Sequence, residues 1–179
     1  MHEEIAVAGF GGQGVLFVGR LLAEASLLEG REVVWMPSYG AEKRGGTVWC
    51  NVTISDEKIG ALFITRPTAA IAMNPASLVK LEPAMKPGGL LVVNQSLVPS
   101  KVSREDIRVV YVPANDLATE LGDDSVGNLV TLGALVTGCP VVSTSSIIAV
   151  MDNLLSKNQR RLEINKRALS KGCAWMQGN

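Results

Sequence analysis

The stretch that decides the fold is Val7-Ala8-Gly9-Phe10-Gly11-Gly12-Gln13-Gly14-Val15. It begins in a short apolar run, passes through four glycines and leads into a long apolar segment with helical spacing. A strand, a glycine-rich turn and a helix in this order are typical of the first unit of a nucleotide-binding α/β fold. We therefore predict a three-layer, Rossmann-like α/β fold with a mostly parallel sheet.

The glycines of this turn are predicted to have different roles. Gly9 would allow a tight turn, because glycine reaches positive φ at little cost. Gly11 and Gly12 would leave room for a ligand or another backbone, and Gly14 would let the helix lie close to the strand. The backbone N–H groups at the helix start, together with the positive end of the helix dipole, would then suit an anionic group.

The turn also matches the dinucleotide pattern G-x-G-x-x-G, through Gly9, Gly11 and Gly14. A dinucleotide fold needs a carboxylate about 20 residues further on, at the end of the second strand, to hold the ribose. The second predicted strand, residues 32–36, begins with Glu32 and ends without a carboxylate. This argues against NAD and leaves an anion-binding turn and a ligand-free turn both open.

Composition limits the remaining classes of function. The 179 residues suffice for a substantial core, and we predict a single domain over residues 1–179. The 17 basic and 17 acidic residues balance, so no excess charge favours nucleic acid or an anionic membrane. The hydrophobic content of 47% suggests that other subunits cover part of the surface.

The polar residue types argue against several chemistries. Cys50, Cys139 and Cys173 are scattered and odd in number, which disfavours disulfides, zinc and iron–sulfur ligation and suits a reducing, cytoplasmic setting. His2 is the single histidine and lies in a terminus that is expected to fray. The first residues are acidic, so no signal peptide is expected. We therefore expect no histidine-based catalysis, no Cys/His metal site and no iron–sulfur ligand set in this chain.

Residues 125–151 carry no charged side chain and, at 27 positions, would be long enough to span a bilayer. Several glycines and the sequence Gly138-Cys139-Pro140 interrupt them, and Ser143 or Thr144 would cap a new helix. We interpret this segment as two buried or interface helices rather than a membrane span.

The loop after the second strand is the second candidate functional element. Residues 13–29 are predicted to form a helix, and residues 32–36 the next parallel strand of a right-handed β-α-β unit. The polar residues 37–47 would then lie at the carboxyl edge of the sheet, where ligands bind in such folds. Arg44, followed by two glycines, would suit a phosphate or carboxylate. A surface loop with a solvated Arg44 is the alternative.

The rest of the chain is predicted to alternate between strands and helices. Residues 48–55 alternate and are expected to pair with residues 58–64 as an inserted β-hairpin. Asn74 and Pro75 are expected to start a helix. Further expected strands cover 68–73, 90–94 and 107–112, and further expected helices cover 76–85, 115–121 and 156–171, with stops at Gly30 and Gly172 and a capping box at Ser156 and Gln159.

Together these motifs resemble the gamma subunit, or the equivalent fused domain, of the 2-oxoacid:ferredoxin oxidoreductases, which act on pyruvate, 2-oxoglutarate or branched-chain oxoacids. The resemblance rests on residues 9–15, on Ser38-Tyr39-Gly40, on Arg44-Gly45-Gly46-Thr47 and on the segment around Asn128, and it covers essentially the whole chain. Ala41-Glu42 departs from the Pro-Glu expected in many relatives, and proline would stiffen this loop.

The resemblance implies a role within a larger enzyme. Such enzymes convert a 2-oxoacid, coenzyme A and oxidised ferredoxin into acyl-CoA, carbon dioxide and reduced ferredoxin. In members with separate subunits, thiamine diphosphate, its magnesium ion and the iron–sulfur clusters lie on companion chains. The resemblance therefore implies that this chain contributes no catalytic residue and no metal ligand. The expected partners are alpha and beta chains, a ferredoxin-like delta chain in some assemblies, and ferredoxin as the electron acceptor.

Within that enzyme, the glycine turn and the Arg44 loop are expected to form one polar edge that lines the path of coenzyme A. The candidate binding residues are Gly9, Gly11, Gly12, Gln13, Gly14, Ser38, Tyr39, Gly40, Arg44, Gly45 and Gly46. The alternative is that this edge binds no ligand and only packs against another subunit. Glycines are equally needed where two backbones approach closely. Two further alternatives are a free-standing NAD(P)-dependent oxidoreductase and a regulatory nucleotide-binding module.

Overall fold

The computed structural model describes residues 1–40 and 46–178 and contains a six-stranded sheet with the order β2-β3-β1-β4-β5-β6. The strands are β1 (His2–Phe10), β2 (Glu32–Tyr39), β3 (Thr47–Ser55), β4 (Ala69–Ala72), β5 (Leu90–Asn94) and β6 (Arg108–Val112). The helices are α1 (Val15–Leu28), α2 (Pro75–Ala84), α3 (Ala114–Glu120), the 3-10 helix η1 (Asp124–Val126), α4 (Gly127–Gly138), α5 (Thr144–Leu154) and α6 (Gln159–Gly178).

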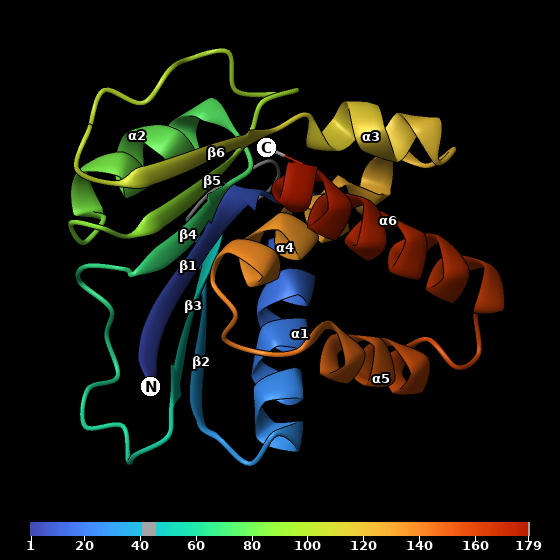
Figure 1. Ribbon diagram of the computed structural model, residues 1–179, viewed down its shortest axis with the longest axis horizontal. Coiled ribbons are helices and arrows are strands. Elements are labelled where there is room, and N and C mark those ends of the chain that lie inside the picture. The colour runs from blue at the N-terminus through green and yellow to red at the C-terminus, as the bar shows by residue number, and fades with distance from the viewer. Residues whose placement is uncertain (41–45, 179) are drawn as a thin grey trace.

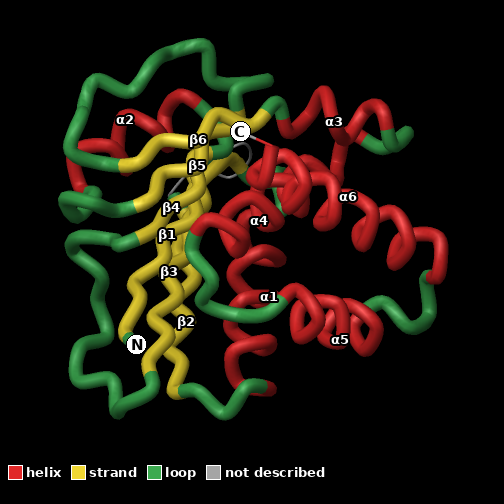
Figure 2. Tube along the Cα trace, viewed as in Figure 1, coloured by secondary structure: helices red, strands yellow, loops and turns green. Residues whose placement is uncertain are grey.

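The helices cover the two faces of the sheet unequally. Helix α2 lies on one face, while α1 and α4 lie on the other, as Figure 1 shows. Helices α5 and α6 pack outside α1 and α4, so that side of the sheet is two helices deep (Figure 2). Strands β1, β4, β5 and β6 are parallel. The predicted Rossmann-like α/β class, with a mostly parallel sheet and C-terminal helices, is confirmed.

The position of the second strand differs from the prediction. Strand β2 does not lie beside β1, because β3 is inserted between them and pairs antiparallel with both. Strand β2 therefore runs in the direction of β1 and ends at the same edge of the sheet. It also extends to Tyr39, past the predicted end, with Pro37 in an edge strand, where proline is tolerated.

The predicted inserted hairpin is present, but the prediction that residues 58–64 form its second strand is wrong. Residues 58–64 form no strand, and the hairpin consists of β2 and β3. Both edges of β3 are occupied, since Val52 pairs with Ile5 on one side and with Trp35 on the other. No edge of β3 is left for a third strand to pair with.

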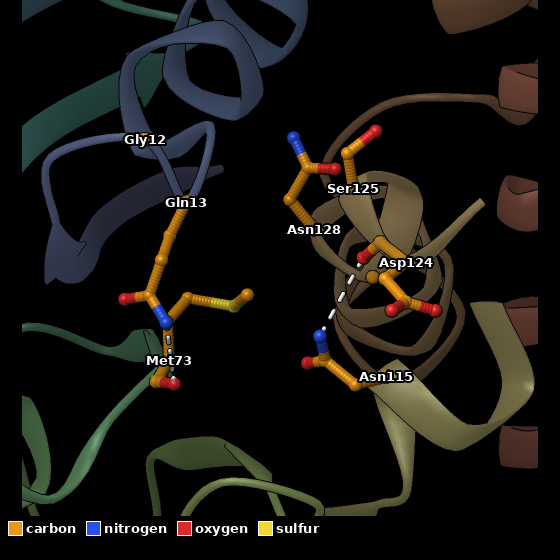
Figure 3. A pocket seen from close by; sticks show the side chains of 8 residues that line it. Gly12, Gln13, Met73, Asn115, Asp124, Ser125 and Asn128 are labelled. Atoms are coloured by element: carbon orange, nitrogen blue, oxygen red, sulfur yellow. Dashed lines mark hydrogen bonds between the residues drawn. The ribbon is translucent and has the colours of Figure 1, made fainter. Parts of the chain in front are cut away.

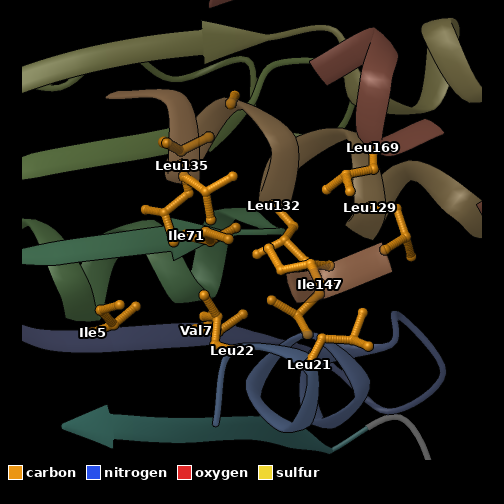
Figure 4. Close-up of a cluster of buried hydrophobic side chains, with 14 of the residues drawn as sticks. Ile5, Val7, Leu21, Leu22, Ile71, Leu129, Leu132, Leu135, Ile147 and Leu169 are labelled. Carbon is orange, nitrogen blue, oxygen red and sulfur yellow. The ribbon is translucent and has the colours of Figure 1, made fainter. Parts of the chain in front are cut away.

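The main hydrophobic core lies between the sheet and the layer formed by α1 and α4. Figure 4 shows apolar side chains of β1, α1, β4, α4, α5 and α6 meeting there, among them Ile71, Leu22 and Leu132. A smaller core joins the opposite face of the sheet to α2, where Ala8 packs with Leu78 and Leu91. Because strands β4 and β5 are buried on both faces, they read as continuous apolar runs.

Most predicted helix ends are confirmed. Asn74 caps α2 by accepting the Ser77 N–H over 2.8 Å, and Ser143 caps α5. The α6 boundaries are a correction: Asn158, not Ser156, accepts the first-turn N–H of Arg161 over 3.0 Å. Gly172 does not end this helix.

Gly172 is required for the packing of α6 against α4, not for ending α6. A Cβ at Gly172 would overlap the Val130 carbonyl oxygen of α4, so this glycine serves a close crossing of two helices. Residues 125–151 divide into η1, α4 and α5 with a break between the last two, as predicted. In the part of the chain that the structure describes, no helix has the length and apolar character to cross a membrane.

Candidate functional site

The glycine turn joins β1 to α1 at the carboxyl edge of the parallel strands. Gly12 and Gly14 have positive φ values of 95° and 72°, which glycine adopts at least cost. Gln13 closes the turn in two ways. Its backbone N–H donates to the Phe10 carbonyl (3.1 Å), and its side-chain Oε1 accepts the Phe10 N–H (2.7 Å).

Two of the predicted glycine roles are wrong. Gly9 lies inside β1 without positive φ, and a Cβ there would come within 2.7 Å of Gln13 Oε1 and 2.8 Å of Val15 Cγ2. It is needed for close packing beneath the turn rather than for the turn itself. At Gly14 a Cβ would overlap the Asn128 amide. The missing side chain at Gly14 therefore makes room for Asn128 of α4, and does not serve to let α1 lie close to the strand.

The backbone N–H of Gly11 in the glycine turn is already hydrogen-bonded and is not free for a ligand. Its N–H donates to the Gly46 carbonyl over 3.1 Å, which joins the glycine turn to the loop between β2 and β3. No described side chain caps α1. The N–H groups of its first residues therefore have no acceptor within the helix, and they lie at the positive end of the helix dipole. Within the glycine turn, the N–H groups that remain free of side-chain acceptors are those at the start of α1.

The second predicted element is partly strand rather than loop. Ser38 and Tyr39 belong to β2 and pair with β3, and the Gly40 N–H donates to the Thr47 carbonyl over 2.7 Å. Gly46 is brought next to the glycine turn through its contact with Gly11. The predictions for Arg44 and Gly45 concern positions outside the described residues.

Two clefts flank the glycine turn. The polar cleft has a volume of about 280 Å³ and is lined by Gly12, Gln13, Met73, Asn115, Asp124, Ser125, Gly127 and Asn128. Figure 3 shows Gln13 and Met73 on one wall of this cleft, facing Asn115, Asp124, Ser125 and Asn128 on the other. It thus connects the carboxyl ends of β1 and β4 with the start of α4.

The apolar cleft lies on the other side of the turn. It has a volume of about 310 Å³ and is lined by Phe10, Gly11, Gly12, Gly14, Val15, Leu16, Phe17, Tyr39 and Val48. Tyr39 is 69% exposed at its rim. None of the described residues that line either cleft is Lys or Arg.

Several residues that line the polar cleft, or that hydrogen-bond to residues lining it, were not predicted as site residues. Asn74 donates its amide N–H to Gln13 Oε1 over 3.0 Å, and Asn94 donates to Asn115 Oδ1 over 2.8 Å. Asn74 and Asn115 follow the ends of β4 and β6 closely, and Asn94 ends β5. Their position at the carboxyl ends of strands was the available signal. Asp124 follows no strand, so its place in the cleft depends on tertiary packing.

Ion pairing next to the polar cleft involves Asp123. The Ser125 hydroxyl and N–H lower the pKa of the Asp123 carboxyl, and the Arg161 guanidinium, 2.7 Å away, lowers it further. Within residues 1–40 and 46–178, no three His, Cys, Asp or Glu side chains gather as a metal site.

The sequence and fold place the chain in a known family. The chain belongs to the pyruvate ferredoxin/flavodoxin oxidoreductase family, whose model matches residues 4–175. It is 33% identical over 176 residues to the ketoisovalerate oxidoreductase subunit VorA of Methanothermobacter marburgensis. That match covers 98% of this chain and 37% of the relative, so the chain spans little more than a third of that protein.

Solved structures share the fold. The gamma subunit of a keto/oxoacid ferredoxin oxidoreductase from Geobacter sulfurreducens superposes with a TM-score of 0.83 at 29% identity, over 99% of both chains. The 2-oxoglutarate:ferredoxin oxidoreductase of Magnetococcus marinus, solved with 2-oxoglutarate, coenzyme A and succinyl-CoA bound, gives a TM-score of 0.90 at 26% identity. This second match covers 99% of the present chain and 31% of the other.

Proposed function

We propose that this chain, as one domain over residues 1–179, is the gamma subunit of a 2-oxoacid:ferredoxin oxidoreductase. The assembly would oxidatively decarboxylate a 2-oxoacid to acyl-CoA and carbon dioxide and reduce ferredoxin. The observation that carries the proposal is the likeness to the Geobacter gamma subunit over 99% of both chains. A cytoplasmic location belongs to the proposal, because three free cysteines suit a reducing compartment.

The chemistry is assigned to companion chains. The described residues of this chain offer no ligand set for a metal centre or an iron–sulfur cluster. Thiamine diphosphate, magnesium and the clusters would be held by alpha, beta and ferredoxin-like delta chains. When bound there, they supply the decarboxylation and the transfer of electrons to ferredoxin.

The contribution of this chain is the carboxyl edge of its sheet. We assign the path of coenzyme A to the glycine turn and the adjoining loop, with Gly9, Gly11, Gly12, Gln13, Gly14, Ser38, Tyr39, Gly40, Arg44, Gly45 and Gly46 as the proposed binding residues. Two observations support this: the first turn of α1 is uncapped, and a structural relative contains bound coenzyme A. A nicotinamide cofactor is less favoured, because Ser38 and Tyr39 occupy the end of β2, where a ribose-binding carboxylate is expected.

The test is purification of the tagged chain from native cells under anaerobic, low-salt conditions. We expect a brown complex with companion chains, thiamine diphosphate and oxoacid-dependent reduction of ferredoxin in the presence of coenzyme A. A colourless chain recovered alone, which binds a nucleotide without partners, would overturn the proposal in favour of a regulatory nucleotide-binding module.

A further inference from the structure

The Gln13 side chain in the glycine turn is held at both ends of its amide group. Its Oε1 accepts the Phe10 N–H over 2.7 Å, and its Nε2 donates to the Met73 carbonyl oxygen over 3.4 Å. A backbone N–H only donates and a carbonyl oxygen only accepts, so the two contacts agree on which end of the amide is nitrogen. Figure 3 shows this nitrogen beside Met73, with the oxygen turned away from the opposite wall of the polar cleft.

Asn74, the N-cap of α2, supports the same orientation of the Gln13 amide. Asn74 is 2% exposed, and its Oδ1 accepts the Ser77 N–H over 2.8 Å and the Ser77 hydroxyl over 2.9 Å. Because these two donors occupy the Oδ1, the Nδ2 is the end that faces Gln13. It donates to Gln13 Oε1 over 3.0 Å. The cap of α2 therefore helps to decide which end of the Gln13 amide is directed toward the polar cleft.

One side-chain N–H of Gln13 remains available to a ligand. The Nε2 carries two hydrogens, and the Met73 carbonyl oxygen accepts one of them. The described part of the chain supplies no acceptor for the other. Gln13 lines the polar cleft, which has a volume of about 280 Å³, so an acceptor atom of a ligand in this cleft can take the second hydrogen bond.

The polar cleft also lies where a sheet of this kind binds ligands. It is lined by Gly12 and Gln13, which follow β1, and by Met73, which follows β4. Strands β1 and β4 are parallel neighbours, but the helices that follow them, α1 and α2, cover opposite faces of the sheet (Figure 1). A crevice for ligands opens at the carboxyl ends of the strands at such a point. Gln13 thus lies at the position that the topology provides for a ligand.

We infer that Gln13 donates this N–H to an acceptor oxygen of the ligand, and that Asn74 is the positioning residue that keeps the nitrogen of Gln13 toward the cleft. The inference rests on the proposed function, because the ligand is then coenzyme A. If the Gln13 amide were inverted, its oxygen would face the ligand oxygen and the hydrogen bond would be replaced by a repulsive contact.

The substitution Asn74→Asp separates the positioning role from the capping role. Aspartate is as good an N-cap as asparagine, so the bond from the Ser77 N–H is retained. The introduced carboxylate cannot donate to Gln13 Oε1, and two acceptors in contact force the Gln13 amide to turn or withdraw. The matched control is Asn158→Asp, because Asn158 accepts the Arg161 N–H at the start of α6 and does not line the polar cleft.

The first measurement is the hydrogen exchange of the Phe10 amide in the full chain labelled with ¹⁵N. Asn74→Asp is expected to raise the exchange rate about tenfold, because the Phe10 N–H loses its bond to Gln13 Oε1. Asn158→Asp is expected to leave the rate as it is in the wild type. An unchanged rate at Phe10 in Asn74→Asp would overturn the positioning role of Asn74.

The second measurement is steady-state turnover of the assembled complex with the concentration of coenzyme A varied. Asn74→Asp is expected to raise the KM for coenzyme A about tenfold while kcat stays within about twofold, as for a contact that binds the ligand without entering the chemistry. Asn74→Ser keeps a capping hydroxyl, lacks the N–H that reaches Gln13, and takes the place of Asn74→Asp if that variant does not fold. An unchanged KM in a variant whose Phe10 amide exchanges faster would overturn the donation by Gln13.

Failure of this inference is distinguishable from failure of the proposed function. An active wild-type complex in which Asn74→Asp behaves like Asn158→Asp retains the proposed function and loses the inference. A wild-type preparation without reduction of ferredoxin that depends on coenzyme A overturns the proposed function, and with it coenzyme A as the partner of Gln13. The exchange of the Phe10 amide decides the role of Asn74 in either case.

Discussion

Asn128 on α4 lies directly against Gly14, the residue before α1, although the two are 114 positions apart in the chain. The Asn128 amide donates to the Gly14 carbonyl oxygen over 3.3 Å, and no space remains for a Cβ at Gly14. Gly14 also has a φ of 72°. The start of α1 and one wall of the polar cleft are therefore fixed by the same contact.

Gly14→Ala is expected to destabilise the protein more than Gly12→Ala. Both positions have positive φ, which costs alanine about 1 kcal/mol or more. Only at Gly14 does the new methyl group also displace Asn128, since nothing lies within 4 Å of a Cβ at Gly12. We expect a loss of about 2–4 kcal/mol for Gly14→Ala, measured by urea unfolding. Equal losses in both variants would contradict this packing role.

Gly172→Ala is expected to disrupt the crossing of α4 and α6. Its Cβ would overlap the Val130 carbonyl oxygen, and a backbone atom cannot move aside as a side chain does. We expect a loss of about 3 kcal/mol in the free energy of unfolding. Gly178→Ala in the same helix is the control, because open space surrounds a Cβ there. A Gly172→Ala variant as stable as this control would show that the helices separate freely.

The Asp123 carboxyl should contribute to stability in a pH-dependent way. Ser125 and then Arg161 lower its pKa in the folded protein. A lowered folded-state pKa stabilises the protein above the unfolded-state pKa of about 4, and this stabilisation is lost as the pH falls through the folded value. The difference in unfolding free energy between wild type and Asp123→Asn should shrink from pH 7 to pH 3. A difference independent of pH would rule out this linkage.

Cys50 should resist alkylation in the folded protein. Burial raises the pKa of its thiol to about 12, so the reactive thiolate is scarce at pH 8. Mass spectrometry after brief iodoacetamide treatment is expected to find Cys50 unmodified in the native chain and modified in urea. Rapid labelling of Cys50 in the native chain would mean that β3 and α1 separate readily, since Cys50 packs against Gly19.

Arg44→Ala separates a ligand role from a packing role for the loop between β2 and β3. If Arg44 binds an anionic group of coenzyme A, the KM for coenzyme A should rise about tenfold or more in an intact complex. If it only packs against a companion chain, the complex should dissociate at unchanged protein stability. Arg66→Ala, an exposed arginine before β4 at the opposite edge of the sheet, is the matched control. An Arg44→Ala complex that behaves like this control would contradict both roles.

The sequence was informative where local pattern controls structure. The glycine turn, the buried strands β4 and β5, the Asn74 cap and the break between α4 and α5 were all predicted, because each depends on neighbouring residues. The α6 boundary was not, since Gly172 carries the same local signal whether it ends a helix or packs against one. Only the Val130 carbonyl oxygen beside it separates the two cases.

The candidate site was predictable to a similar extent. The carboxyl edge of the sheet and the glycine turn follow from the order of strand, turn and helix. The polar cleft does not follow from the local sequence. Asn128 and Asp124 line it, but they lie more than 100 residues after the glycine turn in the chain. Their hydrogen-bonding state depends on partners that no local spacing encodes.

The sequence by itself determined that this protein is an α/β fold with a glycine turn at the edge of a mostly parallel sheet, because φ preferences and apolar periodicity act over a few residues. Only the tertiary structure decided that β3 lies between β2 and β1 and that α4 closes one side of the turn. Strand pairing and helix packing join residues far apart in the chain, and their free energies depend on which surfaces remain unpaired once the other elements have formed.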